Sequence, residues 1–387
     1  MHRLSSLVLT LLIAPVAAQT TTRFGAWLDG PQVVPPSSSP AGGIGALTLF
    51  EPSNLVFATL DVDNFQVATN MIADVHIGAA GTNTPVRFTL GGGFGTNPAF
   101  CGAAQLTAGE VNTLKAGGFY IDVRTTQDPG GAIRGQFDTG LTSLFVGVMD
   151  GAQEVPPVTT NALGHAGLLL NADGSAQYYV VVRGMTGTAA HFHRGAVGVT
   201  GPPVVTLLGG PTEWNDFTRV LTAAEIADVR AGLWYANAHS ATHPGGEVRG
   251  QLRAAAMPTI FGTGCPGTGG RVAMTAIEIP PLLGTPTELM LLAGAKPNAP
   301  GAYLLDVLPL AQPINLGIVG APNCNLYMLG QVTIPLGTDS NGCASFELTA
   351  PLLRSLLGTV LYGQNVILDT GAPGLLVSTN ATRALVQ

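Results

Sequence analysis

The stretch FGAWLDGPQVVPP at residues 24–36 returns as FVGVMDGAQEVPP at residues 145–157. Two further blocks recur in the same order further along the chain. These are LTAGE at 106–110 with LTAAE at 221–225, and PGGAIRGQ at 129–136 with PGGEVRGQ at 244–251. Several blocks that repeat in one order indicate a duplicated structural unit. We therefore predict two tandem copies of one module.

The repeated blocks also predict local structure. Thr107 with Glu110, and Thr222 with Glu225, form the Thr-x-x-Glu pattern that caps a helix start. The two short helices are expected to end near glycines that accept a left-handed cap. The Pro-Gly-Gly turns then lead into a last strand. Other apolar or alternating runs predict further strands, namely 46–50, 55–60, 119–123, 166–170, 177–182 and 233–239.

Composition supports an all-β fold. Only 10% of the 387 residues are charged, and the chain holds 52 glycines and 28 prolines. Short strands with tight turns fit this composition better than long surface helices, which need many charged residues. We predict two tandem Greek-key or immunoglobulin-like β-sandwiches, or barrels, at residues 20–139 and 140–256. A third, β-rich domain without the repeat is expected at 257–387.

The N-terminus has the layout of a secretory signal peptide. His2 and Arg3 precede an apolar run from Leu7 to Val16, and small residues follow. The run is too short for a stable membrane span. We expect residues 1–19 to be removed and the mature protein to be secreted, either extracellular or periplasmic. The net charge of −7 also argues against nucleic-acid binding.

Four cysteines suit an oxidising compartment. Cys101 stands apart, whereas Cys265, Cys324 and Cys343 lie in the last third of the chain. Four cysteines allow three complete pairings, and spacing alone does not choose among them. We favour a Cys265–Cys324 disulfide and leave Cys101 and Cys343 unassigned.

Several motifs of the second copy together resemble the CHRD (chordin-type) domain. They are QEVPP at 153–157, AHFHRG at 190–195, GPPVV at 201–205, LTAAE at 221–225, AGLWY at 231–235 and PGGEVRGQ at 244–251. The first copy matches more loosely. The resemblance implies a β-sandwich module of the kind found in chordins and in secreted bacterial proteins. It implies a fold rather than a particular function.

The histidines are the candidate chemical groups. His191 and His193 are two residues apart, so on a strand they share one face. His239 ends a later strand, and His243 precedes the Pro-Gly-Gly turn. Three or four imidazoles form a competent copper or zinc site. We predict that His191, His193 and His239 bind a transition metal, with His243 as a fourth ligand. Exposed or backbone-bonded histidines are the alternative.

The first copy differs at these positions. His76 aligns with His193, whereas Asp74, Arg124 and Asp128 stand where the second copy has His191, His239 and His243. A cationic Arg124 would repel a metal. Asp74, His76 and Asp128 leave a weak oxygen-rich site open, but a structural role for this copy is favoured. Arg134 and Arg249, shared by both copies, are expected to tie down loops rather than bind a ligand.

We therefore predict a secreted, non-enzymatic binding or structural protein that holds one copper or zinc ion. Its partner would be an extracellular protein or a matrix component. Two alternatives stay open. One is a metalloenzyme, because a His-x-His strand with distant histidines is similar to copper–zinc superoxide dismutase. The other is an adhesion or matrix protein without a metal.

Overall fold

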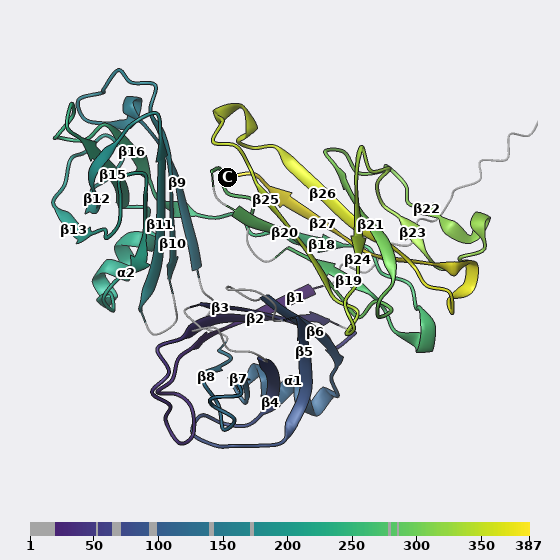
Figure 1. Cartoon of the computed structure of the whole chain (residues 1–387). Coiled ribbons are helices and arrows are strands. Elements are labelled where there is room, and N and C mark those ends of the chain that lie inside the picture. The colour runs from purple at the N-terminus through teal and green to yellow at the C-terminus, as the bar shows by residue number, and fades with distance from the viewer. Residues whose placement is uncertain are drawn as a thin grey trace, which may run out of the picture.

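The computed structural model describes residues 20–51, 53–63, 71–92, 99–138, 143–170, 174–277, 280–284 and 286–387. In these ranges the chain is mainly β-structure, arranged as two curled sheets and a third β-rich body (Figure 1). The all-β prediction is confirmed. The expected signal peptide at 1–19 lies outside the described residues. No described helix has the length and apolar character needed to cross a membrane.

The first copy is one eight-stranded antiparallel sheet that curls on itself. Its strands are β1 (Thr20–Leu28), β2 (Gly42–Glu51), β3 (Leu55–Asp63), β4 (Ile72–Ile77), β5 (Val86–Gly92), β6 (Ala99–Gln105), β7 (Phe119–Arg124) and β8 (Ile133–Gln136). They pair in the order β1-β2-β3-β6-β5-β4-β7-β8. Bridges from Gly25 of β1 to Asp138, and from Asp29 just after β1 to Arg134, bring the ends together. One apolar core fills the interior of this barrel-like sheet.

The second copy repeats this architecture. Its strands are β9 (Ser143–Asp150), β10 (Leu163–Leu170), β11 (Ala176–Arg183), β12 (Gly187–Arg194), β13 (Pro203–Thr206), β14 (Glu213–Phe217), β15 (Trp234–Ser240), β16 (Val248–Gln251) and β17 (Arg253–Ala254). The order β13-β12-β15-β16-β9-β10-β11-β14 is the same circular order as in the first copy. Trp214 and Trp234 are buried in its core.

Each copy contains the predicted capped helix. α1 (Ala108–Lys115) and α2 (Ala223–Arg230) both begin with a complete capping box, Thr107 with Glu110 and Thr222 with Glu225. Each helix is followed by a glycine with positive φ, at Gly117 (74°) and Gly232 (68°). A side chain disfavours that conformation, which explains why both copies end the helix at glycine.

The C-terminal module consists of smaller sheets. Its strands are β18 (Thr259–Phe261), β19 (Met274–Ala276), β20 (Pro286–Ala293), β21 (Pro300–Asp306), β22 (Ile314–Asn315), β23 (Asn325–Leu326), β24 (Val332–Gly337), β25 (Ala344–Thr349), β26 (Val360–Leu368) and β27 (Leu376–Leu385). The largest sheet has the order β18-β27-β26-β21-β24. Short 3₁₀ turns complete the chain, at Gly151–Gln153 in the second copy and at Thr268–Gly270, Leu316–Val319, Arg354–Leu356 and Pro373–Leu375 in this module.

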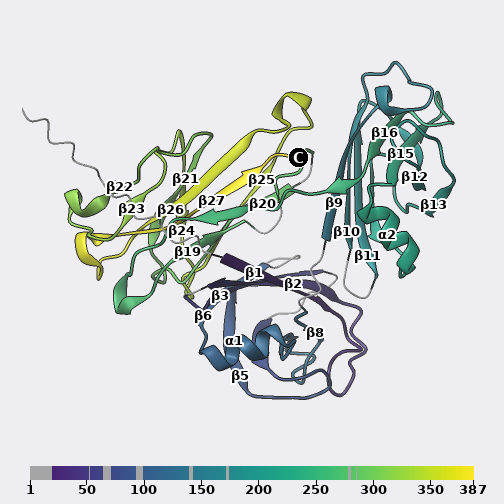
Figure 2. The same cartoon turned by 180° about the vertical axis from the view of Figure 1, so that it is seen from behind.

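The C-terminal module packs against both copies. Phe50 and Phe57 of the first copy share an apolar cluster with Met274 and Leu291, and the Cys101–Cys343 disulfide lies in the same cluster. Leu163 of the second copy joins a smaller cluster around Leu283, Leu352 and Val386. The strands β12, β13 and β15 lie on the far side of the second copy from this module in both views (Figures 1 and 2).

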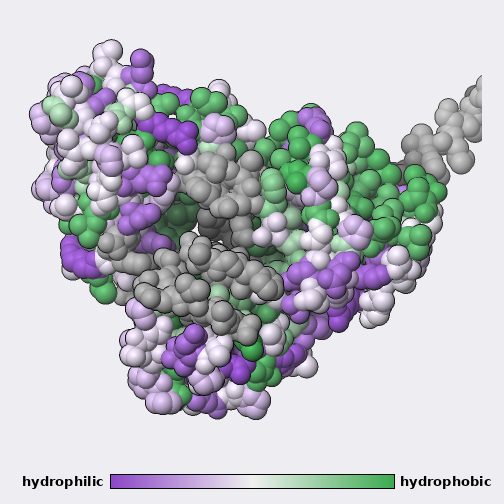
Figure 3. Space-filling model, viewed as in Figure 1, coloured by the Kyte–Doolittle hydropathy of each residue, from purple (hydrophilic) through white to green (hydrophobic). Residues whose placement is uncertain are grey.

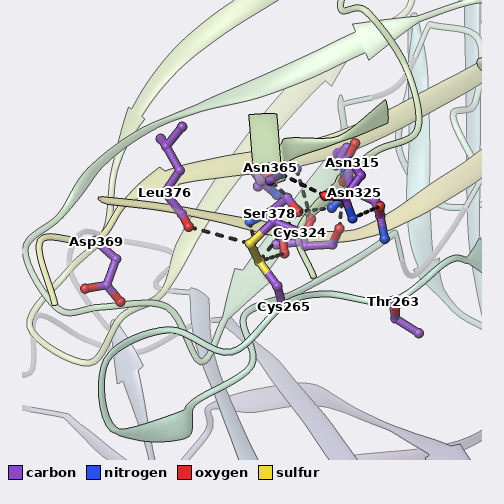
Figure 4. Close-up of a disulfide and its surroundings, with 12 residues drawn as sticks. Thr263, Cys265, Asn315, Cys324, Asn325, Asn365, Asp369, Leu376 and Ser378 are labelled. Atoms are coloured by element: carbon purple, nitrogen blue, oxygen red, sulfur yellow. Dashed lines mark hydrogen bonds between the residues drawn. A yellow bond between two sulfur atoms is a disulfide. The ribbon is translucent and has the colours of Figure 1, made fainter. Parts of the chain in front are cut away.

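The second disulfide joins Cys265 to Cys324, as predicted, with their Cα atoms 4.9 Å apart. Figure 4 shows Ser378 of β27 beside it. The Ser378 amide donates to Cys265 Sγ (3.2 Å), and the Asn325 amide donates to Ser378 Oγ (3.1 Å). The disulfide therefore anchors two loops to the end of one strand. The remaining two cysteines, which the sequence left unassigned, form the cross-link between modules.

Candidate metal centre

The predicted histidines lie on two neighbouring strands of the second copy. β12 and β15 pair antiparallel, with His191 opposite Asn237, His193 opposite Tyr235, and Ala189 opposite His239. The alternate residues, such as Phe192 and Ala238, point into the core. Because side chains alternate along a strand, the histidines share the outer face of the barrel. The structure therefore brings together three of the four predicted ligands.

The three imidazoles converge. One nitrogen of each of His191, His193 and His239 lies within 4.8 Å of the others, and His191 Nδ1 lies 2.9 Å from His239 Nε2. Two nitrogens bound to one zinc or copper ion are separated by at most about 4.2 Å, twice the metal–nitrogen bond. The largest separation among the three nitrogens is thus close to this limit.

Backbone carbonyls fix the tautomer of two rings. His193 Nδ1 donates to the carbonyl of Gly201 (3.0 Å), and His239 Nδ1 donates to the carbonyl of Pro244 (3.0 Å). A carbonyl only accepts, so each ring keeps a lone pair on Nε2. His193 Nε2 is buried and has no hydrogen-bond partner. Metal-bound histidines usually have their other nitrogen held in this way.

The histidines are also in the protonation state that a metal requires. Burial lowers the pKa of His191, and the neighbouring His239 and His193 lower it further. Burial is likewise the main cause of the lowered pKa of His193 and of His239. The lowered pKa values favour neutral rings, the form that binds a cation. The lone pair of His239 Nε2 accepts a hydrogen bond from His191 Nδ1, which a bound ion would have to replace.

The structure does not place His243, the predicted fourth ligand, in this group. β15 ends at Ser240, so His243 lies in the following turn rather than on the strand face. Its Nδ1 lies 3.2 Å from Thr242 Oγ1 and 3.4 Å from a carboxylate oxygen of Glu247. Glu247 in turn accepts hydrogen bonds from Thr160 and Ser240. His243 thus belongs to the hydrogen-bond network of the turn.

The first copy places a different set of groups on the same outer face. Asp74 and His76 of β4 lie beside Asp122 of β7. Asp74 is fully buried; it forms an ion pair with Arg124 and accepts a hydrogen bond from Thr89. Arg124 therefore occupies the position of His239, as the alignment predicted. The ion pair provides a positive charge at the place where the second copy has only neutral imidazoles.

The oxygen-rich set considered for the first copy also changes. Asp128 is in the turn after β7, where its amide and carbonyl bond to Thr125 and Gly131, and Asp122 takes its place beside His76. His76 Nδ1 lies 2.8 Å from the Thr84 carbonyl, and Nε2 lies 3.3 Å from Asp122. Burial alone would lower the pKa of His76, but Asp122, the Thr84 carbonyl and Asp74 together raise it.

Both copies use their shared arginine structurally, as predicted. Arg249 lies 3.5 Å above the Tyr235 ring and donates to the carbonyls of Ala196 and Val199. Arg134 makes the same contact with Tyr120 and donates to the carbonyls of Thr82 and Ala79. In the second copy these bonds hold the loop that carries Gly201, whose carbonyl orients His193.

Two buried residues beside the histidines were missed from the sequence. Asn237 (4% exposed) lies on β15 between Tyr235 and His239, and Glu154 (7% exposed) follows the turn after β9. Asn237 Nδ2 donates to Glu154 Oε1 at 3.4 Å. The period-two alternation of β15 places Asn237 on the same face as His239, and this signal would have identified it.

Comparison with known families agrees with the repeat. The model of the CHRD domain matches residues 24–137 and again residues 145–252, together more than half of the chain. A comparison with curated proteins gives no match.

Proposed function

This chain belongs to the CHRD-domain family, and we propose that it is a secreted, non-enzymatic binding protein whose second CHRD copy holds one transition-metal ion through His191, His193 and His239. Two disulfides and two CHRD domains are consistent with an extracellular location. The metal would be copper or zinc, the ions that imidazole ligands suit.

The arrangement of His193 carries the proposal. Its Nδ1 is committed to the Gly201 carbonyl, and its Nε2 is buried without a partner beside two other neutral histidines. A buried polar atom without a partner costs free energy. A bound metal ion would satisfy this nitrogen and would replace the hydrogen bond between His191 and His239 by two coordinate bonds.

The metalloenzyme alternative has one observation in its favour. With His243 elsewhere, the three histidines leave coordination positions for other ligands, and catalytic sites need such a position. Superoxide consumption by the copper-loaded protein tests this alternative directly. A rate no higher than that of the metal-free protein is expected for a binding protein.

The partner would be an extracellular protein or a matrix component. Figure 3 shows apolar side chains gathered on the C-terminal module. Its most exposed large apolar residues are Ile318 (82%), Leu329 (69%) and Leu308 (67%). Exposed apolar groups of this kind support a role of this module in binding another molecule, whether or not the second copy holds a metal.

Calorimetric titration of the purified full-length chain with Cu²⁺ and Zn²⁺ tests the proposal. We expect one ion per chain. The H191A/H193A variant should bind at least about 100-fold more weakly, because two of three ligands are lost. H243A is the matched control and should bind as the wild type does. Equal stoichiometry and affinity in H191A/H193A and the wild type would show that the histidines do not form a metal site.

A further inference from the structure

We propose that the side-chain oxygen of Asn237 is the fourth ligand of the metal site. This inference rests on the proposed function, because it concerns how the same site is completed. Three histidines alone leave a four-coordinate ion one ligand short. The sequence pointed to His243 for that role, but the structure places His243 in the hydrogen-bond network of the turn.

The strand register places Asn237 among the histidines. It is directly opposite His191 in the β12–β15 pair. His193 is its diagonal neighbour on β12, and His239 lies two residues further along β15 on the same face. Directly opposed side chains on one face of an antiparallel pair have their Cβ atoms about 4.5–5.5 Å apart. Asn237 also lies within hydrogen-bonding reach of His193, where it raises the pKa of that ring against the larger lowering effect of burial.

A buried carboxyl group orients the amide. Asn237 Nδ2 donates to Glu154 Oε1, so the amide nitrogen is engaged on that side and Oδ1 remains as the free end. Gly246 of the Pro-Gly-Gly turn makes room for this contact. A Cβ atom at Gly246 would collide with both Asn237 Nδ2 and Glu154 Oε1, and its φ of 129° also disfavours a side chain.

Two buried acceptors are left without a donor. While His193 is neutral, neither Asn237 Oδ1 nor His193 Nε2 has a hydrogen-bond partner. Neither atom can satisfy the other, because an amide oxygen and an unprotonated ring nitrogen both only accept. A cation bound by both atoms resolves this mismatch without any rearrangement of the strands. Nitrogen and oxygen donors together suit Zn²⁺ and Cu²⁺.

The first copy has different groups at the positions of Asn237 and Glu154. Asp122 occupies the position of Asn237, and Val33 occupies the position of Glu154. There an oxygen of Asp122 faces His76. The raised pKa of His76 favours a proton between the two groups. In the second copy the carboxyl group is that of Glu154, and the Asn237 amide contacts it. The oxygen facing the histidine is therefore neutral. It raises the pKa of His193, but burial outweighs this effect and the pKa is lowered overall.

Binding measurements on three variants test the role of Asn237. Asn237→Leu keeps the size of the side chain but removes the oxygen, and should weaken Cu²⁺ binding by about 10–100-fold, the range seen when supporting groups of metal sites are lost. Asn237→Asp restores an oxygen ligand and should bind at least as tightly as the wild type. Glu154→Gln keeps an acceptor for the amide and should change affinity less than Asn237→Leu does.

A spectroscopic measurement on the wild-type chain does not depend on how the variants fold. Protein labelled with ¹³C at the asparagine side-chain carbonyl should show a ¹³C coupling in the pulsed ENDOR spectrum of its Cu²⁺ complex. The unlabelled aspartate of Asn237→Asp should abolish this coupling while binding persists. If copper binds through the histidines but no ¹³C coupling appears, Asn237 is not a ligand. If the wild type binds no metal, the proposed function itself has failed.

Discussion

The two CHRD copies share their strand order, capped helix and buried arginine, yet they differ on the outer face of one strand pair. The first copy carries an Asp74–Arg124 ion pair there, together with a histidine whose pKa is raised. The second carries three neutral histidines. The comparison shows that the module folds with either set of side chains, so the histidines are not required by the fold and are available for another role.

The largest expected effect concerns the feature that the copies share. R134M and R249M each remove hydrogen bonds from a buried guanidinium to loop carbonyls, and each should destabilise its copy by about 3 kcal/mol. R249M should cost more, because Glu154 lies near Arg249 and would lose a compensating charge, whereas the first copy has Val33 at that position. Hydrogen–deuterium exchange resolved by copy measures this. Equal exchange in both variants and the wild type would contradict the structural role.

The next effect concerns the feature that differs. H191D/H239R gives the second copy the Asp–Arg pair of the first, and should weaken Cu²⁺ binding by about 100-fold or more, because two ligands are lost and a cation is added. The thermal unfolding temperature should change little, since the first copy is folded with this pair. Calorimetry and thermal unfolding measure the two outcomes. Undiminished copper binding in a folded variant would rule out the site.

The smallest expected effect is a different pH dependence of stability in the two metal-free copies. The pKa of His76 is raised, so its stabilising contribution is present below its ordinary value of about 6.5 and is lost as the pH rises through the raised value. The pKa values of His191, His193 and His239 are lowered, so acidification below about pH 6.5 favours the unfolded second copy. Hydrogen exchange between about pH 7.5 and 5.5 should show protection falling only in the second copy. A parallel response of both copies would contradict this prediction.

The repeat predicted the fold well because its blocks correspond to local physical requirements. Thr107 and Thr222 cap helices through contacts three residues away, and the strand alternation that places His191 beside His193 is equally local. Such short-range rules can be applied to a sequence without knowing the tertiary structure.

The parts of the site that escaped prediction depend on where strands end and which groups lie behind them. His243 falls outside the cluster because β15 stops at Ser240. Glu154 contacts Asn237 although the two residues are 83 positions apart in the chain. The contact fits because Gly246, which lies against both side chains, has no Cβ atom. The pairing of Cys101 with Cys343 likewise follows from how the C-terminal module packs on the first copy.

That disulfide has a topological consequence. Cys101 and Cys343 are 242 residues apart, and the whole second copy lies between them. The second copy and its three histidines thus lie within a covalent ring, which the disulfide between the first copy and the C-terminal module closes. A single proteolytic cut anywhere in that ring opens it without releasing either half, so the two fragments would remain one molecule for as long as the disulfide persists.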